Sequence, residues 1–333
     1  MLAVLCPGQG SQSPGMLAPW LELPGVADQV AAFGEAASLD LRAHGTESDA
    51  ETIRDTAVAQ PLIVASSLVA LRAILDGRDT ADVVDVTAGH SVGELAAAAV
   101  AGALTDVGAV GLVAHRARAM AAAAAATPTG MSAVVGGDPE EVLAAIEAAH
   151  LWPANVNGGG QVVAAGALDH LAALAENPPA KARVIPLQVA GAFHTPFMQP
   201  ALEAFEPVAA SWDVADPRLP FLSNADGESY GTIDIEGSTF GKARDVVRRL
   251  TAQIAAPVRW DLCQETLAEL GVTAILELAP GGVLTGLARR TLKGVESVAV
   301  KSPDDVEAAR DLIARHSVVG GAAKTSVPAG DDA

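Results

Sequence analysis

The pentapeptide Gly-His-Ser-Val-Gly at residues 89–93 lies between a short apolar run and an alanine-rich stretch. The run at 82–89 is typical of a buried strand, and the stretch at 92–101 is typical of a close-packed helix. Small residues on both sides of Ser91 permit a sharp turn that lifts the serine above an α/β sheet. The pattern therefore predicts an α/β fold in which a serine faces the N-terminus of a helix.

A G-x-S-x-G pattern also occurs at ordinary junctions between a strand and a helix, where the serine only caps the helix. From the residues alone, both interpretations of Ser91 stay open. Glu94 lies three residues further on, in the first helical turn, where a carboxylate favours the helix dipole. We do not expect Glu94 to be the base of Ser91.

A nucleophilic serine needs a base within hydrogen-bond reach, and the chain has seven histidines. His90 adjoins the serine, and we expect it to point to the opposite side of the turn and to pack there. His194 lies in a loop with Gly191 and Pro196, which favours it as the base, although a lone loop histidine is usually structural. Positions within helices or near the C-terminus disfavour four others, His115, His150, His170 and His316.

The middle of the chain follows the order β-α-β-β-α-β, which is the ferredoxin-like pattern. Asp138 and Pro139 mark the beginning of its first helix, as N-cap and first helical residue. The pattern predicts strands at 131–137, 153–157, 161–166 and 182–187, and helices at 138–150 and 167–176. We expect a small subdomain of residues 128–190 inserted into a discontinuous large α/β domain of residues 1–127 and 191–315, and a disordered tail at 316–333.

Apolar runs and helical periodicity supply the elements of the large domain. The predicted strands are 2–6, 82–89, 219–223 and 272–278. The predicted helices are 26–37, 59–75, 92–101, 106–126, 198–211, 244–254, 259–270, 281–290 and 303–315.

The charge of the chain limits its partners. With 40 acidic and 21 basic residues, the net charge of −19 argues against nucleic-acid binding and disfavours anionic membranes. The two cysteines, Cys6 and Cys263, are far apart, so neither a disulfide framework nor a zinc site is expected. Neither a signal peptide nor a transmembrane segment is apparent, and we expect a reduced, cytoplasmic protein.

Five segments in this order and spacing resemble the malonyl-CoA:acyl-carrier-protein transacylases of type II fatty acid synthesis. They are PGQGSQSPGM at 7–16, GHSVGEL at 89–95, AHRARAM at 114–120, GAFHTPFM at 191–198 and QIAAPVRW at 253–260. The resemblance covers about residues 1–315. It implies a large α/β-hydrolase-like domain with a parallel-sheet core and an inserted ferredoxin-like subdomain.

The resemblance also implies residue roles. Ser91 would be the acylated nucleophile and His194 its general base and acid, held by a main-chain carbonyl at Gln253. The backbone N–H groups of Gln9 and Val92 would form the oxyanion hole.

Five further positions match the pocket of the family. Arg116 would bind the malonyl carboxylate with its planar fork, although by itself it reads as a surface charge. Phe193 would narrow the pocket against branched acyl groups. Gln60 could contact substrate or cap the helix that Pro61 starts, and Asn157 and Asn224 could face the cleft or serve as turn residues.

The implied reaction moves a malonyl group from malonyl-CoA to the phosphopantetheine thiol of acyl carrier protein, without a cofactor or a metal. Malonyl-CoA and the carrier protein would be the only partners of a monomer. Acyl carrier proteins are acidic, so docking needs a local basic patch. Three candidates are open: Lys181 with Arg183, Arg248 with Arg249, and Arg289 with Arg290 and Lys293.

Three alternatives remain at this point. A serine thioesterase or hydrolase would use the same turn, but it expects a histidine near the C-terminus, where only His316 stands. A carrier-binding scaffold without activity would usually have lost Ser91, His194 or Arg116. A polyketide-type acyltransferase cut from a larger enzyme is less expected, because the chain begins at Met1 and ends soon after its last helix.

Overall fold

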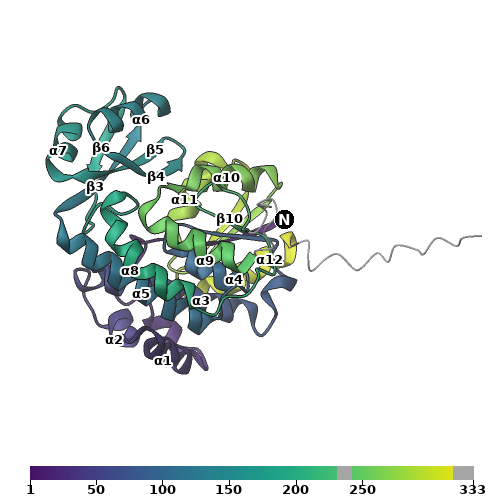
Figure 1. Ribbon diagram of the computed structural model, residues 1–333. Helices are drawn as coiled ribbons and strands as arrows, with labels where there is room; N and C mark the ends of the chain where they lie inside the picture. The colour runs from purple at the N-terminus through teal and green to yellow at the C-terminus, as the bar shows by residue number, and fades with distance from the viewer. Residues whose placement is uncertain (231–241, 318–333) are drawn as a thin grey trace, which may run out of the picture.

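Two five-stranded sheets organise the chain, one parallel and one largely antiparallel (Figure 1). The structure is a computed structural model and describes residues 1–230 and 242–317. The large sheet has the order β10-β9-β1-β2-β7, and all its strand pairs are parallel. Its strands are β1 (Leu2–Cys6), β2 (Val86–Gly89), β7 (Phe221–Leu222), β9 (Ala274–Glu277) and β10 (Glu296–Ala299).

Helices cover both faces of the large sheet, which explains why β1 is apolar at every position. Leu2, Val4 and Cys6 pack on one side, while Ala3 and Leu5 pack on the other. The first side holds α1 (Val26–Ala37), α2 (Leu41–Thr46), α3 (Thr56–Leu75), α4 (Gly93–Val100), α5 (Asp106–Ala126), α8 (Gln199–Ala210), α9 (Lys242–Ala252) and α12 (Val306–His316). The second side holds α10 (Trp260–Glu269) and α11 (Val283–Thr291).

Among the described residues, α3 alone is long and apolar enough to cross a membrane. Its mean hydropathy over 18 residues is 1.8, and 83% of that window is buried inside the protein. Core helices that pack on all sides share this composition.

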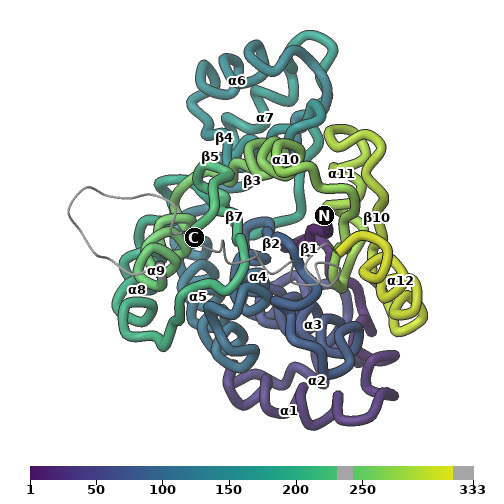
Figure 2. The backbone as a smooth tube through the Cα atoms, turned by 90° about the vertical axis from the view of Figure 1, so that its right-hand side faces the viewer, coloured from purple at the N-terminus to yellow at the C-terminus, as the bar shows by residue number. Residues whose placement is uncertain are grey.

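The small sheet contains β3 (Thr129–Gly136), β4 (Trp152–Gly158), β5 (Gln161–Ala167) and β6 (Ala182–Pro186). Their order is β6-β3-β5-β4, and each of these neighbours is antiparallel. The helices α6 (Pro139–Ala148) and α7 (Leu168–Glu176) cover one face, as Figure 2 shows at the top of the molecule. The order of elements predicted for 131–187 is confirmed, and Asp138 caps α6 by accepting from the backbone N–H of Glu140 and of Glu141.

A fifth strand joins the small sheet from outside the inserted segment. β8 (Val258–Arg259) pairs in parallel with β4, with Val258 opposite Asn155. The predicted subdomain boundaries at 128 and 190 stay a prediction, but the sheet itself extends beyond them.

Several elements differ from the sequence-based expectation. The helix predicted at 59–75 begins at Thr56, because the Asp55 side chain caps it by accepting from the Ala57 backbone N–H. Pro61 therefore lies inside that helix and does not start it. α2, β8 and β10 were not expected. α12 continues through His316, and the tail predicted at 316–333 lies outside the described residues from 318 onward.

Candidate active site

Ser91 lies at a tight turn between β2 and α4, in the left-handed backbone region with φ 52°. Two glycines make this turn possible. A Cβ atom on Gly89 would lie 2.0 Å from the backbone carbon of Gly93, and one on Gly93 would lie 2.2 Å from the backbone oxygen of Cys6. A side chain at Gly89 would push the beginning of α4 away from the end of β2, and one at Gly93 would push the turn away from β1, so both glycines are needed where they stand.

Ser91 and His194 meet directly, although 103 positions separate them in the chain. Ser91 Oγ lies 2.7 Å from His194 Nε2. On the other side of the ring, His194 Nδ1 lies 2.8 Å from the backbone oxygen of Gln253. Because a carbonyl oxygen can only accept, Nδ1 carries the proton and Nε2 faces the serine as an acceptor.

The imidazole of His194 is kept neutral by its surroundings. Its side chain is 3% exposed, and His194 is the second non-glycine residue of the site with a positive φ, 62°. Burial lowers the pKa of His194 to about 3, and the nearby positive charge of Arg116 acts in the same direction. A neutral imidazole is the form that can take a proton from a serine.

Arg116 brings a fully buried guanidinium to within 3.5 Å of the serine, measured from Nη2 to Ser91 Oγ. Nη1 donates to Gln60 Oε1 at 2.7 Å, and Nη2 donates to Gln253 Oε1 at 2.6 Å. Nε is buried and has no hydrogen-bond partner among the described residues. Burial lowers the pKa of Arg116 to about 10, so the group stays cationic at neutral pH.

A cavity of about 220 Å³ opens over Ser91 and His194, between the turn and the uncovered face of the small sheet. Gln9, Gln60, His90 and Phe193 line it from the large-sheet side. The small sheet contributes Met131, Ala133, Asn155, Asn157, Gln161 and Val163, and α11 contributes Val283, Leu284 and Leu287. The cavity thus has an apolar wall with a few polar groups, as small-molecule sites commonly do.

The geometry of a serine, a histidine and a buried arginine agrees with three comparisons. The acyl transferase domain model matches residues 4–314. The malonyl CoA-acyl carrier protein transacylase of Mycobacterium tuberculosis is 52% identical over 317 residues, which span 94% of this chain and 100% of that protein. This chain belongs to the malonyl CoA-acyl carrier protein transacylase family. The resemblance inferred from five motifs is therefore confirmed.

Solved structures of this transacylase family agree with the fold. The crystal structure of MCAT from Mycobacterium tuberculosis has a TM-score of 0.85 and 52% identity, and the match covers 93% of this chain and 99% of that one. A type II PKS acyl-carrier protein in complex with its malonyl-transacylase matches with a TM-score of 0.83 and 29% identity, over 93% and 99% of the two chains. The expected fold class, a large α/β domain with an additional small sheet, is confirmed.

Most of the site residues expected for a transacylase of this family lie together. Ser91, His194, Gln9, Gln60 and Phe193 line one cavity, and so does Asn157. Arg116 and Gln253 stand directly behind its wall, in contact with Gln60 and the serine. Val92 occupies the N-cap position of α4, next to the serine. Across the described chain, the backbone N–H groups of Gln9 and Val92 have no hydrogen-bond partner.

Three interpretations from the sequence are corrected. The expectation for His90 is partly wrong: its ring packs edge-on against Trp260, with ring centroids 5.5 Å apart, but it also lines the cavity, and its Nε2 lies 2.9 Å from Asn157 Oδ1. Gln60 does not cap a helix, because α3 begins one turn earlier and the Gln60 side chain meets Arg116. Asn224 does not face the cleft: its Oδ1 accepts from the Ser91 backbone N–H at 2.7 Å, and its Nδ2 donates to the Gly89 oxygen.

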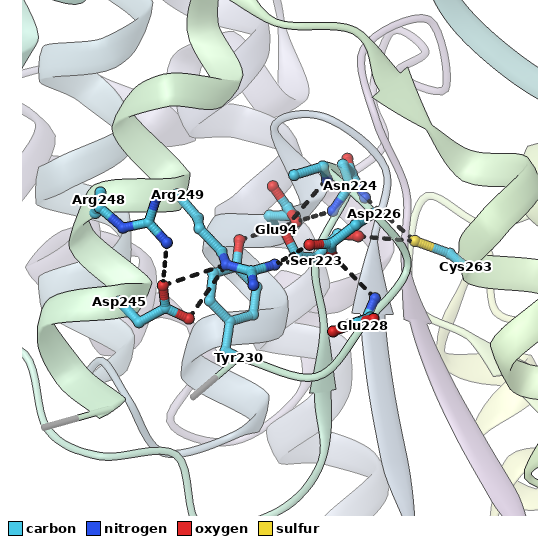
Figure 3. A network of polar contacts seen from close by, with 11 residues as sticks. Glu94, Ser223, Asn224, Asp226, Glu228, Tyr230, Asp245, Arg248, Arg249 and Cys263 are labelled. Atoms are coloured by element: carbon cyan, nitrogen blue, oxygen red, sulfur yellow. Dashed lines mark hydrogen bonds and ion pairs between the residues drawn. The ribbon is translucent and has the colours of Figure 1, made fainter. Parts of the chain in front are cut away.

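Glu94 was expected only to favour the helix dipole, and that interpretation is incomplete. Its side chain is fully buried and accepts hydrogen bonds from the Asn224 backbone N–H at 2.6 Å and from the Tyr230 hydroxyl at 3.0 Å (Figure 3). The Gln253 side-chain amide donates to the second carboxylate oxygen. Burial raises the pKa of Glu94 to about 7. The only signal in the sequence was a single charge in an alanine-rich helix.

Proposed function

We propose that this chain transfers the malonyl group of malonyl-CoA to the phosphopantetheine thiol of acyl carrier protein, through a malonyl-serine intermediate. The observation that carries the proposal is the alignment of Ser91 Oγ, the His194 ring and the Gln253 carbonyl, with Arg116 Nη2 3.5 Å from the same Oγ. The alignment supplies a nucleophile and a base, and the guanidinium supplies a cation for an acyl group that ends in a carboxylate.

In the first step, Ser91 Oγ attacks the thioester carbonyl while His194 Nε2 takes the hydroxyl proton. The tetrahedral oxyanion lies against the backbone N–H groups of Gln9 and Val92. When the carbon–sulfur bond breaks, coenzyme A leaves as a thiol with the proton from His194. Each oxyanion donor in such sites is worth about 100- to 1,000-fold in rate.

In the second step, the thiol of the carrier's phosphopantetheine gives its proton to His194 and attacks the malonyl-serine ester. Collapse of the intermediate returns the proton to Ser91 Oγ and leaves the malonyl group on the carrier as a thioester. The reaction needs no resident cofactor or metal, because serine and histidine provide both the nucleophile and the proton transfer.

Arg116 is the proposed ligand of the malonyl carboxylate. Its guanidinium has no exposed surface. Gln60 and Ser91 contact the guanidinium and also line the cavity, so the substrate carboxylate approaches Arg116 at these two residues. The unpartnered Nε supports a ligand, since a buried donor without a partner costs about 1–3 kcal/mol. A clamped carboxylate would hold the ester carbonyl in the oxyanion hole and out of line for water.

Phe193 lines the cavity beside the base and would restrict the acyl group. One additional methyl group in such a pocket is worth about 1–3 kcal/mol. A preference for malonyl over methylmalonyl of roughly ten- to 200-fold follows from this range.

The structure narrows the candidates for carrier docking. Arg249 is 4% exposed and pairs with Asp226 and Asp245, and Arg248 pairs with Asp245, so this pair is engaged within the protein (Figure 3). The patch of Arg289, Arg290 and Lys293 is exposed at the end of α11, whose first turns line the cavity. This position favours it over Lys181 and Arg183 as the face for an acidic carrier. We expect the enzyme to act as a cytoplasmic monomer that needs no membrane.

Intact-protein mass spectrometry tests the proposal. After brief mixing with malonyl-CoA, the parent chain should gain the mass of one malonyl group and lose it on addition of holo-acyl carrier protein, while Ser91→Ala should gain nothing. Release of coenzyme A without a mass gain would favour a thioesterase. If the chain neither gains mass nor releases coenzyme A, the result would favour a carrier-binding scaffold without activity.

A further inference from the structure

Gln253 stands between two buried groups of opposite charge. Its side-chain Oε1 accepts from Arg116 Nη2 at 2.6 Å, and its Nε2 donates to the carboxylate of Glu94 and to the Ser91 backbone oxygen at 2.8 Å. The oxygen and nitrogen of an amide differ little in shape, so their hydrogen-bond partners decide which way the amide points. Arg116 can only donate and an ionised Glu94 can only accept, so both require the same orientation.

Glu94 is itself held firmly. The Asn224 backbone N–H and the Tyr230 hydroxyl both donate to its Oε1, which leaves Oε2 for Gln253 (Figure 3). Glu94 is 0% exposed, so water does not replace these partners.

The two charges balance each other through the amide. Among the residues that the structure describes, no ion pair within 4.0 Å involves either Arg116 or Glu94. Both are fully buried, where an uncompensated charge is costly. In its ionised form, above pH 7, the Glu94 carboxylate therefore serves as the counter-charge of the guanidinium, with Gln253 as the bridge.

We propose that Glu94 is a positioning residue for acyl-group selection: it fixes the Gln253 amide with its oxygen toward Arg116 and so aims the guanidinium at the substrate carboxylate. The inference rests on the proposed malonyl transfer. It assigns the glutamate of the G-x-S-x-G-E segment a part in recognising the acyl group, beyond its place in the first turn of α4.

The inference distinguishes two acyl groups. An acetyl group has no carboxylate and does not need Arg116, whereas a malonyl group does. A role limited to supporting the fold would slow both acylations by the same factor. The ratio of malonyl to acetyl acylation rates is therefore the measurement that separates positioning from support.

The experiment compares single-turnover acylation by malonyl-CoA and by acetyl-CoA in the parent chain and in Glu94→Gln. In this variant the –NH2 group of residue 94 would face the –NH2 group of Gln253, and two donors cannot form a hydrogen bond with each other. The Gln253 amide should therefore turn, and its oxygen would no longer accept from Arg116. We expect the malonyl-to-acetyl ratio to fall about tenfold or more, which is the size of one hydrogen bond to a charged group. An unchanged ratio in a folded variant would overturn the inference.

Two further variants keep the test decisive. If Glu94→Gln does not fold, Glu94→Asp replaces it: the charge stays but the carboxylate is withdrawn from Gln253, and the ratio should fall in the same direction by a smaller factor. In a Gln253→Ala background, Glu94→Gln should change the ratio no further, because the bridge is already absent. If Glu94→Gln lowered the malonyl-to-acetyl ratio in the Gln253→Ala background as much as in the parent chain, Glu94 would act without Gln253.

The matched control is Asp85→Asn. Asp85 is another buried carboxylate, 6% exposed, which accepts from the Leu2 backbone N–H just before β2, at the opposite end of that strand from Ser91. Its loss should leave the ratio unchanged. If the parent chain forms no malonyl-enzyme in the same assay, the proposed function fails, and this outcome is distinct from failure of the inference.

Discussion

At the scale of single residues, Arg116 combines a fixed charge with incomplete hydrogen bonding. Replacing it by alanine should slow malonyl acylation by roughly 100-fold, because a buried hydrogen-bonded charge pair is worth about 2–5 kcal/mol. Acetyl acylation should change much less. Rates from quenched single-turnover mixtures would check this, with Arg116→Lys as the control that keeps a charge and loses the planar fork. An equal fall for both acyl groups would contradict a carboxylate clamp.

The depressed pKa of His194 predicts an unusual pH profile. An ordinary histidine, with a pKa near 6.5, would lose its function as a base on acidification through pH 6.5. Because the pKa of His194 lies at about 3, its imidazole stays neutral and the acetylation rate should stay level from about pH 7.5 to 5. Acetyl-CoA is the suitable substrate here, because an acetyl group has no carboxylate and the role proposed for Glu94 concerns only the malonyl carboxylate. A decline centred near pH 6.5 would contradict the expected profile.

Sequence patterns reached the residues of the site that lie in short, ordered motifs, such as Ser91 and His194. They did not reach Glu94, because its partners come from distant parts of the chain. Asn224, Tyr230 and Gln253 lie 130, 136 and 159 positions away. No local pattern records that three donors from two distant segments converge on one carboxylate, and burial of a single glutamate follows only from that convergence.

At the scale of elements, α11 depends on a carboxylate from the neighbouring strand. Glu277, the last residue of β9, is fully buried and accepts from the backbone N–H groups of Leu284 at 2.9 Å and Thr285 at 2.8 Å. Glu277→Ala should lower the free energy of unfolding by about 2–3 kcal/mol, because two donors at a helix N-terminus lose their acceptor. Urea-induced unfolding measures this.

An exposed helix cap provides the comparison for Glu277. Asp40 accepts from the Ala43 backbone N–H at 2.9 Å at the beginning of α2, in contact with solvent. Asp40→Ala should cost only about 1 kcal/mol. Equal losses in the two variants would mean that burial of the Glu277 carboxylate adds nothing to the cap.

Strands within an apolar run were predictable, and strands without one were not. The apolar runs at β1 and β9 predict buried strands because both faces of a parallel sheet are covered. β7 lies within the strand predicted at 219–223, but β8 contains two residues, too few for any periodicity to appear. β10 forms the edge of the large sheet, and its partly exposed sequence lacks the apolar run of a central strand.

At the scale of the whole molecule, the net charge of this chain is −19, so an acidic carrier needs a local basic patch on the surface of the chain for docking. Reversing the patch on α11 with Arg289→Glu and Arg290→Glu should slow transfer to acyl carrier protein by about tenfold or more, through slower association. Acylation by malonyl-CoA should change far less. Transfer rates at rising carrier concentration and at two salt concentrations would check this.

The other exposed patch serves as the control for docking. Arg183→Glu, at the edge strand β6 of the small sheet, should leave transfer to the carrier nearly unchanged. A larger effect from this variant than from the α11 pair would move the docking face to the small sheet.

The inserted segment could be predicted because its six elements follow one another in sequence, with Asp138 and the Gly158–Gly160 turn as local signals. The fifth strand could not, because β8 follows Gln253 and reaches the small sheet from elsewhere in the chain. Its pairing with β4 depends on how the two sheets approach each other, which is a property of the assembled fold.

The pairing of β8 with β4 has a consequence for anyone who wishes to change the acyl specificity by exchanging modules between relatives. The stretch that ends in β8 also carries the Gln253 carbonyl that holds His194. A graft of residues 128–190 alone would bring in a new cavity wall but not the β8 that pairs with it in the relative. A mismatch between the new β4 and the original β8 would then displace His194. A chimera should therefore exchange residues 253–259 together with the insert.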